Sequence, residues 1–254
     1  MSVIGVVSMK GGVGKTSITA NLATAIASKL GPGRVCVVDL DPQNALHWHF
    51  GLETSSSSGV CKQSLRDGDW SEAVSASEFG VDCLPYGDVN ESDRVAFETL
   101  LAKKPDFMGA CLKRAGLGND AVVLIDTPPG PSVYLRQVFA CADLVLIVLL
   151  ADAASYATIP AMESWLDDPL VAHPPRGCLY VLNQVDSREP LNRDVTELLH
   201  QKLDVRLVSI RIHYDEAVSE ALAFQQPVLD YDPHGQASND LARLATWAIK
   251  TLNR

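Results

Sequence analysis

The residues best suited to chemistry lie near the start of the chain, where three glycines, two lysines and a threonine occur within positions 10–16. Glycines let backbone N–H groups surround phosphate oxygens, a lysine adds positive charge, and a threonine hydroxyl can ligate Mg²⁺. A strand is expected before this segment and a helix after it, so the positive end of the helix dipole would face a bound anion. The pattern therefore predicts a phosphate-binding loop. Its predicted ligand-binding residues are Gly11, Gly12, Val13, Gly14, Lys15, Thr16 and Ser17.

Carboxylates stand at the ends of two further expected strands. Asp39 and Asp41 close the strand expected at 35–39, and Asp126 closes the strand expected at 121–126. Ligands of open α/β sheets bind beyond the carboxyl ends of the strands, so these carboxylates are expected beside the phosphate loop. An aspartate that closes an apolar strand next to such a loop holds Mg²⁺ directly or through water. The sequence thus predicts Thr16 and Asp126 as the metal ligands.

The elements that must position these residues alternate between short apolar strands and helix-length amphipathic segments. Apolar strands without alternation are typical of strands covered on both faces, and alternating strands and helices predict a mostly parallel sheet with helices on both sides. We expect one three-layer α/β domain over residues 1–254, with seven or eight strands. The expected strands are 3–8, 35–39, 81–84, 121–126, 144–150, 178–183 and 206–210, and the expected helices are 16–30, 91–115, 131–142, 153–167, 190–203, 214–226 and 238–252.

Composition narrows the class of protein. The chain has 254 residues, 21 basic against 31 acidic side chains, and a net charge of -10, which disfavours binding to nucleic acid or anionic lipid without a concentrated basic patch. Its first 38 residues nevertheless carry four cations and no carboxylate, as an anion site requires. The six cysteines are far apart and are expected to be reduced thiols. The apolar run at 144–151 is too short to span a membrane, and the expected location is the cytoplasm.

The segment Lys10-Gly-Gly-Val-Gly-Lys15-Thr resembles the deviant Walker A motif of the ParA/MinD superfamily of P-loop ATPases, although Met9 stands where the general P-loop pattern has glycine. The resemblance implies ATP and Mg²⁺ as cofactors, slow regulatory hydrolysis, and an ATP-bound homodimer in which Lys10 reaches the phosphates of the partner subunit. Asp39-Leu-Asp41-Pro-Gln resembles switch I, and the Thr-Pro-Pro-Gly sequence after Asp126 resembles switch II. The resemblance assigns catalytic roles to Lys10, Lys15 and Asp41, the last as the residue that positions the attacking water.

The same resemblance places the nucleotide base near Asn183, in the sequence Asn-Gln-Val-Asp that ends the strand 178–183. An amide can serve N6 and N7 of adenine together. The sequence is also one substitution from Asn-Lys-x-Asp, which selects guanine, so GTP remains an alternative. Ile210-Arg211 and Pro227-Val228 match the C-terminal superfamily pattern of a loop that closes over the base, and Ile210 and Arg211 are predicted to bind the cofactor.

Several stretches resemble the BcsQ family of cellulose-biosynthesis proteins over nearly the whole chain. They are Leu-Arg-Asp-Gly-Asp-Trp at 65–70, Leu-Pro-Tyr-Gly at 84–87, Asp-Glu-Ala-Val-Ser-Glu at 215–220 and Gln-Pro-Val at 226–228. The resemblance implies a cytoplasmic accessory of cellulose synthesis and secretion, without a membrane anchor of its own. Its implied partners are a BcsR-like small subunit, a BcsE-like cyclic-di-GMP sensor and the cellulose synthase complex at the inner membrane.

Other members of the superfamily suggest alternatives. A ParA-type partition ATPase needs a basic surface for DNA, yet residues 183–254 hold 8 basic against 11 acidic side chains, so no nucleic-acid partner is expected. A MinD-type protein needs a basic amphipathic terminal helix for lipid, whereas the helix at 238–252 is predicted to pack on the core. Cys141 is placed too far beyond Asp126 for an iron–sulfur reductase. His47 and His49 do not share a helix face, so a metal pair there is disfavoured.

Overall fold

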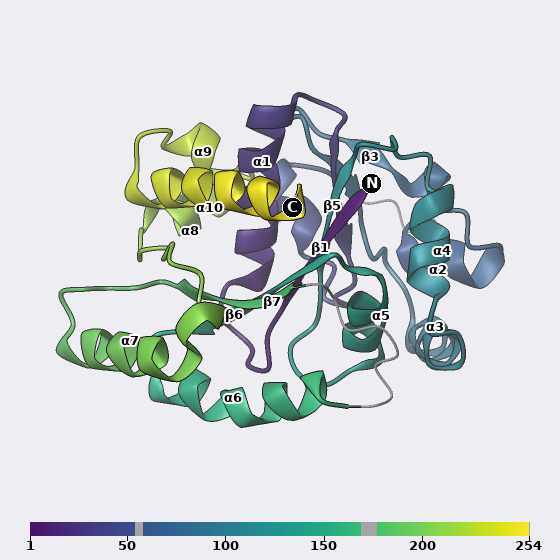
Figure 1. Ribbon diagram of the computed structural model, residues 1–254. Helices are drawn as coiled ribbons and strands as arrows, with labels where there is room; N and C mark the ends of the chain where they lie inside the picture. Colours follow the sequence, from purple (N-terminus) through teal and green to yellow (C-terminus); the bar gives the residue numbers. More distant parts are fainter. Residues whose placement is uncertain (54–57, 169–176, 254) are drawn as a thin grey trace.

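A single mostly parallel sheet forms the centre of the molecule (Figure 1). The computed structural model describes residues 1–53, 58–168 and 177–253. The run of four serines at 55–58 is typical of a loop, and all of it except Ser58 lies outside these ranges. The described strands follow the order β3-β4-β2-β5-β1-β6-β7, and only β3 is antiparallel to its neighbour. The strands are β1 (Ser2–Val7), β2 (Val35–Asp39), β3 (Ser75–Ala76), β4 (Asp82–Leu84), β5 (Val122–Asp126), β6 (Leu144–Leu150) and β7 (Gly177–Asn183).

Both faces of the sheet are buried, which explains why its strands are continuously apolar. Successive side chains of a strand point to opposite faces. Val123 and Ile125 of β5 accordingly pack into one core, while Val122 and Leu124 pack into the other. The first core lies under α3–α7 and the second under α1 and α8–α10, so the predicted three-layer α/β fold is confirmed.

The helices and strands differ from the expectations at several places, which include the short helix α9 (Val228–Tyr231) between two expected helices. The helix expected at 91–115 is two helices, because Lys104 leaves helical geometry ahead of Pro105, as residues before proline usually do. The strand expected at 206–210 is a 3₁₀ turn followed by an extended segment with one isolated bridge to β7. The short helix α2 and the edge strand β3 lie where no element was expected. The α-helices are α1 (Lys15–Leu30), α2 (Val60–Arg66), α3 (Glu91–Lys103), α4 (Phe107–Arg114), α5 (Val133–Cys141), α6 (Ala153–Leu166), α7 (Pro190–Leu203), α8 (Ala217–Ala223), α9 (Val228–Tyr231) and α10 (Gln236–Leu252).

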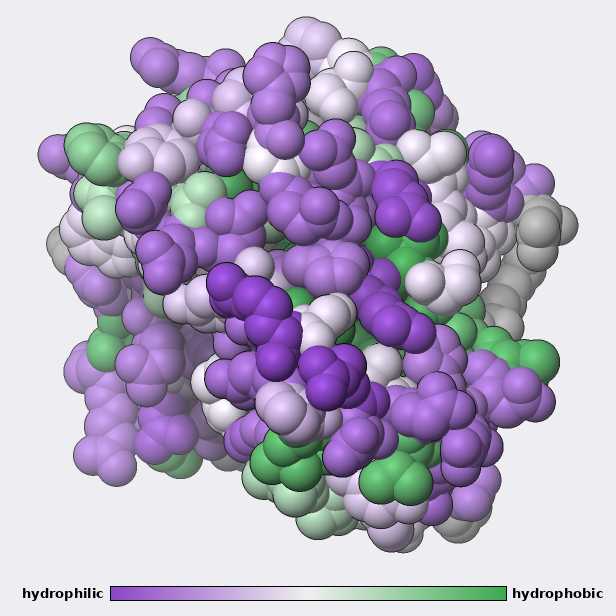
Figure 2. Space-filling model, turned by 90° about the vertical axis from the view of Figure 1, so that its left-hand side faces the viewer, coloured by the Kyte–Doolittle hydropathy of each residue, from purple (hydrophilic) through white to green (hydrophobic). Residues whose placement is uncertain are grey.

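The surface is mainly polar on the side where α7–α10 lie. Figure 2 shows hydrophilic side chains over most of this face, with hydrophobic side chains in separate groups. Among the described residues, no helix is both long enough and apolar enough to cross a membrane.

Candidate functional site

The loop between β1 and α1 adopts the backbone shape of a phosphate cradle. Gly12 and Gly14 have φ values of 72° and 82°, in the left-handed region that favours glycine. A side chain at Gly14 would also collide with the Asn183 amide, because a Cβ there would lie 2.5 Å from Nδ2. Gly11 and Gly12 are exposed, whereas Val13 is buried and anchors the loop to the core. The predicted loop residues therefore lie together at the start of α1.

Lys15 carries a cation that the protein has almost removed from water. Its residue surface is only 7% exposed, and burial lowers the pKa of its ammonium group, while the carboxylates of Asp126 and Asp41 act in the opposite direction. Among the described residues Lys15 forms no ion pair. A buried cation without a close counter-ion is costly, so the site favours an anionic ligand.

Asp126 and Thr16 meet beside this cation. The Thr16 hydroxyl donates a hydrogen bond of 2.6 Å to Oδ2 of Asp126, which is fully buried at the end of β5. Burial raises the pKa of Asp126 to about 6, although Thr16 and Lys15 both stabilise its ionised form. A carboxylate and a hydroxyl at this distance are oxygen donors of the kind Mg²⁺ prefers. The two predicted metal ligands thus lie together, and their chemistry fits the ion.

Asp39 is a second buried carboxylate, directly beside Asp126 in the register of β2 and β5. It accepts the backbone N–H groups of Asp41 and Leu46 at 2.9 and 3.0 Å, so it ties switch I to the end of β2. Burial and the charge of Asp126 raise the pKa of Asp39 well above its usual value. The sequence identified Asp39 only as part of a motif, while the structure gives it a definite role in positioning Asp41.

Lys10, the first residue of the loop motif, pairs with a carboxylate that follows β6. Its Nζ lies 2.6 Å from Oδ2 of Asp152, and both side chains are about one third exposed. Asp152 also caps α6, because Oδ1 accepts the Ser155 N–H at 2.6 Å. Sequence analysis missed Asp152, although a carboxylate just after the strand next to β1 is where a ligand-side residue is expected.

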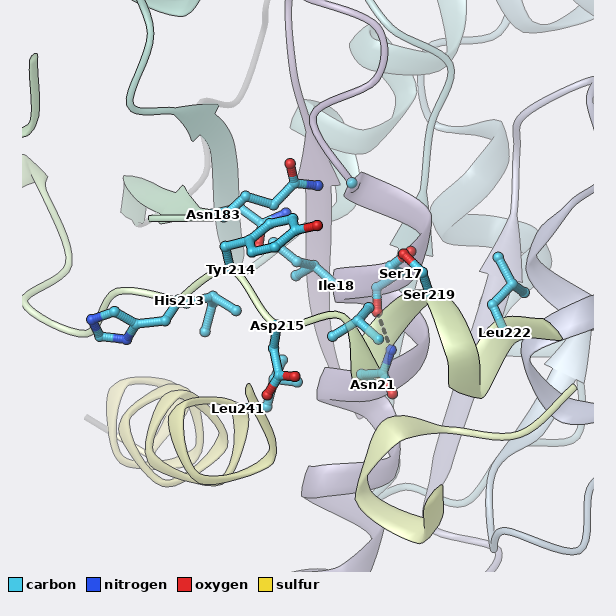
Figure 3. A pocket seen from close by; sticks show the side chains of 14 residues that line it. Ser17, Ile18, Asn21, Asn183, His213, Tyr214, Asp215, Ser219, Leu222 and Leu241 are labelled. Carbon is cyan, nitrogen blue, oxygen red and sulfur yellow. Dashed lines mark hydrogen bonds between the residues drawn. The ribbon is translucent and has the colours of Figure 1, made fainter. Parts of the chain in front are cut away.

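A pocket opens on the other side of the loop, between the start of α1, the end of β7 and the segment 212–222 (Figure 3). In Figure 3 the Tyr214 ring points towards Asn183 and α1, whereas the His213 ring points away from the pocket. The pocket therefore begins at the phosphate loop and extends towards α8 and α10. Its lining residues are Gly14, Ser17, Ile18, Asn21, Asn183, Gln184, Ile212, His213, Tyr214, Asp215, Val218, Ser219, Leu222 and Leu241.

Asn183 links this pocket to the phosphate loop. Its Nδ2 donates to the Val13 carbonyl at 2.8 Å, which leaves Oδ1 free as an acceptor. Asp186, the residue that would select guanine, does not line the pocket. Instead its carboxylate accepts hydrogen bonds from the Arg188 side chain and backbone, which lower the pKa of Asp186 to about 2.

Ile210 and Arg211 lie outside the pocket, unlike the prediction. The segment from Val208 to Ile212 is extended beside β7, through hydrogen bonds to Tyr180 and Leu182. Ile210 therefore faces the buried core, and Arg211 faces α7, where it lies 2.6 Å from His200. The pocket is lined instead by residues 212–215, one to four positions beyond Arg211. The motif located the loop, but not which of its residues face the pocket.

The remaining candidate sites of the sequence do not assemble. Among the described ranges, no group of three or more His, Cys, Asp or Glu side chains could hold a metal ion. His49 is buried, and burial lowers its pKa to about 4. Cys141 ends α5, and burial raises the pKa of its thiol to about 12.

Comparisons with known proteins agree with this geometry. The chain is 27% identical to the cellulose biosynthesis protein BcsQ of Salmonella typhimurium over 249 residues, which cover 98% of this chain and 94% of that protein. Its fold is similar to that of MinD from Pyrococcus horikoshii, solved with Mg-ADP (TM-score 0.76, 22% identity, 98% and 96% of the two chains). A ParA family ATPase from Chlorobium tepidum is similarly close (TM-score 0.78, 22% identity, 96% and 98%). A family model described as cellulose biosynthesis protein BcsQ matches residues 1–249, and the chain therefore belongs to the BcsQ family.

Proposed function

We propose that this protein is an ATPase that binds ATP with Mg²⁺ at the loop before α1. The observation that carries the proposal is the buried Lys15 ammonium beside the Thr16–Asp126 pair, at the point where β1 enters α1. Backbone N–H groups of residues 11–16 and Lys15 would hold the phosphates, and Thr16 and Asp126 would hold the metal. Mg²⁺ supplies charge neutralisation and orients the phosphates. The Mg-ADP bound to the MinD relative supports the same assignment.

Adenine is the base that the pocket favours. The Asn183 amide already uses an N–H towards Val13, so its free Oδ1 offers an acceptor, which suits the N6 amino group of adenine. The carbonyl oxygen of guanine at the same position is itself an acceptor and cannot bond to Oδ1, so it could use only the second N–H of Nδ2. Asp186 is paired with Arg188 outside the pocket, so it is not placed to favour guanine.

Hydrolysis would depend on positioning rather than on covalent chemistry. Asp41 follows β2, and its charge acts on both Lys15 and Asp126, so it lies on the phosphate side of the site, where it would orient a water molecule near the terminal phosphate. The hydrogen bond from the Asp41 N–H to Asp39 fixes the backbone from which this carboxylate projects. We expect slow, regulatory turnover, as the resemblance to the ParA/MinD superfamily implies.

Lys10 makes the site a dimerisation switch in this proposal. In the structure its ammonium pairs with Asp152 of the same chain, at a partly exposed surface where ion pairs are weak. The phosphates bound in a second copy carry more negative charge and would draw Lys10 away from Asp152. The nucleotide-bound dimer would then form a different surface from the monomer.

The cellular role that we propose is that of a cytoplasmic accessory of cellulose synthesis and secretion. Membership of the BcsQ family supports it. The dimer would recruit a BcsR-like small subunit and a BcsE-like sensor, and through them the synthase complex at the inner membrane. A tenfold preference of a partner for the ATP-bound dimer needs a differential binding free energy of only about 1.4 kcal/mol.

Titration calorimetry with ATP and GTP, followed by light scattering, tests the proposal. The parent should bind ATP with Mg²⁺ more tightly than GTP and dimerise with ATP. Asp41→Ala should hydrolyse ATP poorly but still dimerise, whereas Lys10→Ala should bind ATP and remain monomeric. Equal affinity for ATP and GTP would overturn the assignment of Asn183. A monomeric Asp41→Ala variant would overturn the switch.

The cellular role needs a separate assay. Pull-downs with the BcsR-like and BcsE-like proteins should show capture that increases with ATP, and a DNA shift at 150 mM salt should be negative. Salt must be held constant because phosphate contacts weaken steeply with it. ATP-dependent DNA binding without capture of either protein would point to partition instead.

A further inference from the structure

The segment 212–215 forms one wall of the pocket, yet few of its side chains are buried deeply enough to hold it in place. Ile212 is buried, but His213 and Tyr214 are 36% and 50% exposed. Hydrogen bonds between Val185 and both Ile212 and Tyr214 join the segment to the end of β7. These bonds leave the opposite edge of the segment, towards α10, to be fixed by other groups.

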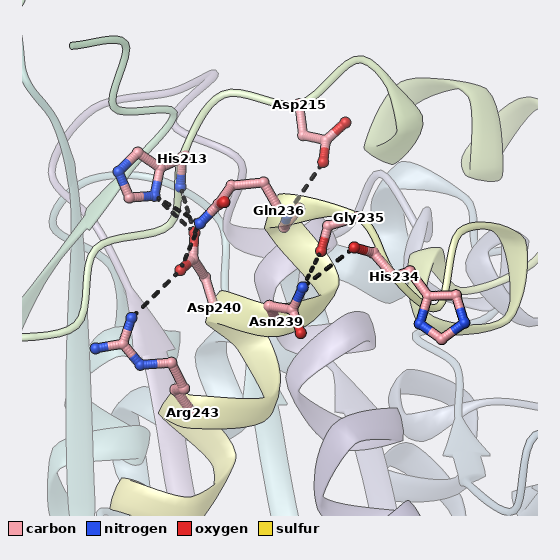
Figure 4. A network of polar contacts seen from close by, with 9 residues as sticks. His213, Asp215, His234, Gly235, Gln236, Asn239, Asp240 and Arg243 are labelled. Atoms are coloured by element: carbon pink, nitrogen blue, oxygen red, sulfur yellow. Dashed lines mark hydrogen bonds and ion pairs between the residues drawn. The ribbon is translucent and has the colours of Figure 1, made fainter.

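Two carboxylates fix that edge reciprocally (Figure 4). Asp240 of α10 accepts the backbone N–H of His213 at 3.1 Å, and the His213 ring nitrogen Nδ1 lies 2.7 Å from the same Oδ2 atom. In the other direction, Asp215 accepts the backbone N–H of Ala237, in the first turn of α10, at 3.0 Å. The loop and the helix therefore hold each other.

The Asp240 carboxylate is buried, with only 1% of its side chain exposed, and it does not line the pocket. A buried carboxylate is tolerated only where hydrogen bonds replace its water. Gln236 donates to both of its oxygens at 3.1 and 3.2 Å, and Arg243 lies 3.8 Å away at the solvent side. The next residue, Leu241, reaches the pocket itself. Asp240 is thus placed to act on the pocket through His213.

We propose that Asp240 is a positioning residue for nucleotide-base recognition, which holds the 212–215 wall at the distance from Asn183 that a purine base requires. The inference rests on the proposed function and deepens it. Its consequence is selective: Asp240 holds the 212–215 wall on the base side, whereas among the described residues it makes no hydrogen bond or ion pair with β1, β5 or the start of α1, which build the phosphate side.

Binding of ADP and of inorganic tripolyphosphate, measured by calorimetry, tests the inference. Asp240→Ala should weaken ADP binding about tenfold, the scale of one charge-assisted hydrogen bond, and leave tripolyphosphate binding unchanged. Arg243→Gln is the matched control, since it touches the same carboxylate but not the loop, and should retain both affinities. If Asp240→Ala does not fold, His213→Ala, at a partly exposed position, should give the same selective loss by a smaller factor.

The possible results distinguish a failure of the role given to Asp240 from a failure of the proposed ATPase function. Unchanged ADP affinity in a folded Asp240→Ala or His213→Ala variant overturns the inference but leaves the ATPase proposal intact. A parallel loss of ADP and tripolyphosphate binding also overturns it, because that result indicates general disruption. A parent protein that binds neither ligand overturns the proposed function and, with it, the inference.

Discussion

The phosphate side and the base side of the site differ in how well their buried charges are compensated. On the phosphate side the charges of Lys15, Asp126 and Asp39 are buried and only partly compensated by their neighbours. Burial lowers the pKa of Lys15 and raises the pKa of Asp126 and Asp39, so it favours the neutral form of each. On the base side, Asp240 is equally buried, but His213 and Gln236 surround it with hydrogen bonds. The first region is built to receive charge from a ligand, and the second is built to keep a shape without one.

The buried charges that serve ligand binding are also those that lower the stability of the ligand-free protein. A buried charge that awaits a partner lowers the stability of the empty protein, and ligand binding restores it. A carboxylate that is already satisfied contributes to the folded state at all times. Removal of a buried charge on the phosphate side should therefore stabilise the ligand-free protein, whereas removal of the satisfied carboxylate on the base side should destabilise it.

The largest effect is expected at Lys15. Lys15→Ala should weaken ATP binding by roughly 100-fold, because it removes a charge-assisted contact to the phosphates in a partly dehydrated site. Lys29→Ala, at the exposed end of the same helix, is the control and should bind normally. The measurement is ATP titration by calorimetry, and full affinity of Lys15→Ala would refute the assignment of the loop.

Asp126→Asn should stabilise the empty protein at neutral pH while it abolishes the Mg²⁺ dependence of ATP binding. The native pKa of Asp126 is raised to about 6, so between about pH 4 and pH 6 the folded state binds more protons than the unfolded state. As pH rises over this window the parent therefore loses about 1–3 kcal/mol more stability than the variant, which keeps the contribution of Asp39 but not that of Asp126. Urea unfolding of both proteins at pH 4.5 and pH 8 measures the difference, and an equal gap at both pH values would contradict it.

Asp152→Asn should favour the dimer by about two- to fivefold in the ATP concentration required, because it releases Lys10 from a partly exposed ion pair. Asparagine caps helices as well as aspartate does, so α6 should keep its N-terminus. Light scattering over an ATP series reads the effect. A variant that needs more ATP than the parent would show that Asp152 assists the dimer instead of restraining Lys10.

The smallest effect is expected at Arg211, whose side chain lies beside His200 and outside the pocket. Arg211→Ala should change ATP affinity less than about twofold, whereas Asn183→Ala should lose about tenfold through its hydrogen-bonding amide. Calorimetry on the pair compares a residue named by the motif with one placed by the fold. Comparable losses in both variants would restore Arg211 to the base site.

The grouping of residues on the phosphate side could largely be predicted from the sequence. Gly12, Gly14, Lys15 and Thr16 are contiguous, and a glycine loop between a strand and a helix has few possible backbone shapes. Asp126 could be added because parallel strands end at one edge of the sheet. The three-layer order followed from apolar strands alternating with helices, although Pro105 divided one expected helix and the edge strand at Ser75–Ala76 carried too little pattern to be seen.

The residues that form the base side could be identified only from the packing of the folded chain. Its walls come from α1, β7, the 212–222 segment and α10, and no local pattern states which residue of an extended segment faces which neighbour. A shift of one position exchanges the two faces, which is why Arg211 turned to α7 while Ile212 reached the pocket. Asp240 and Asp152 have no motif around them. Their roles arise from what the fold brings within hydrogen-bonding distance, because burial and partner geometry are properties of the packed chain and not of its local sequence.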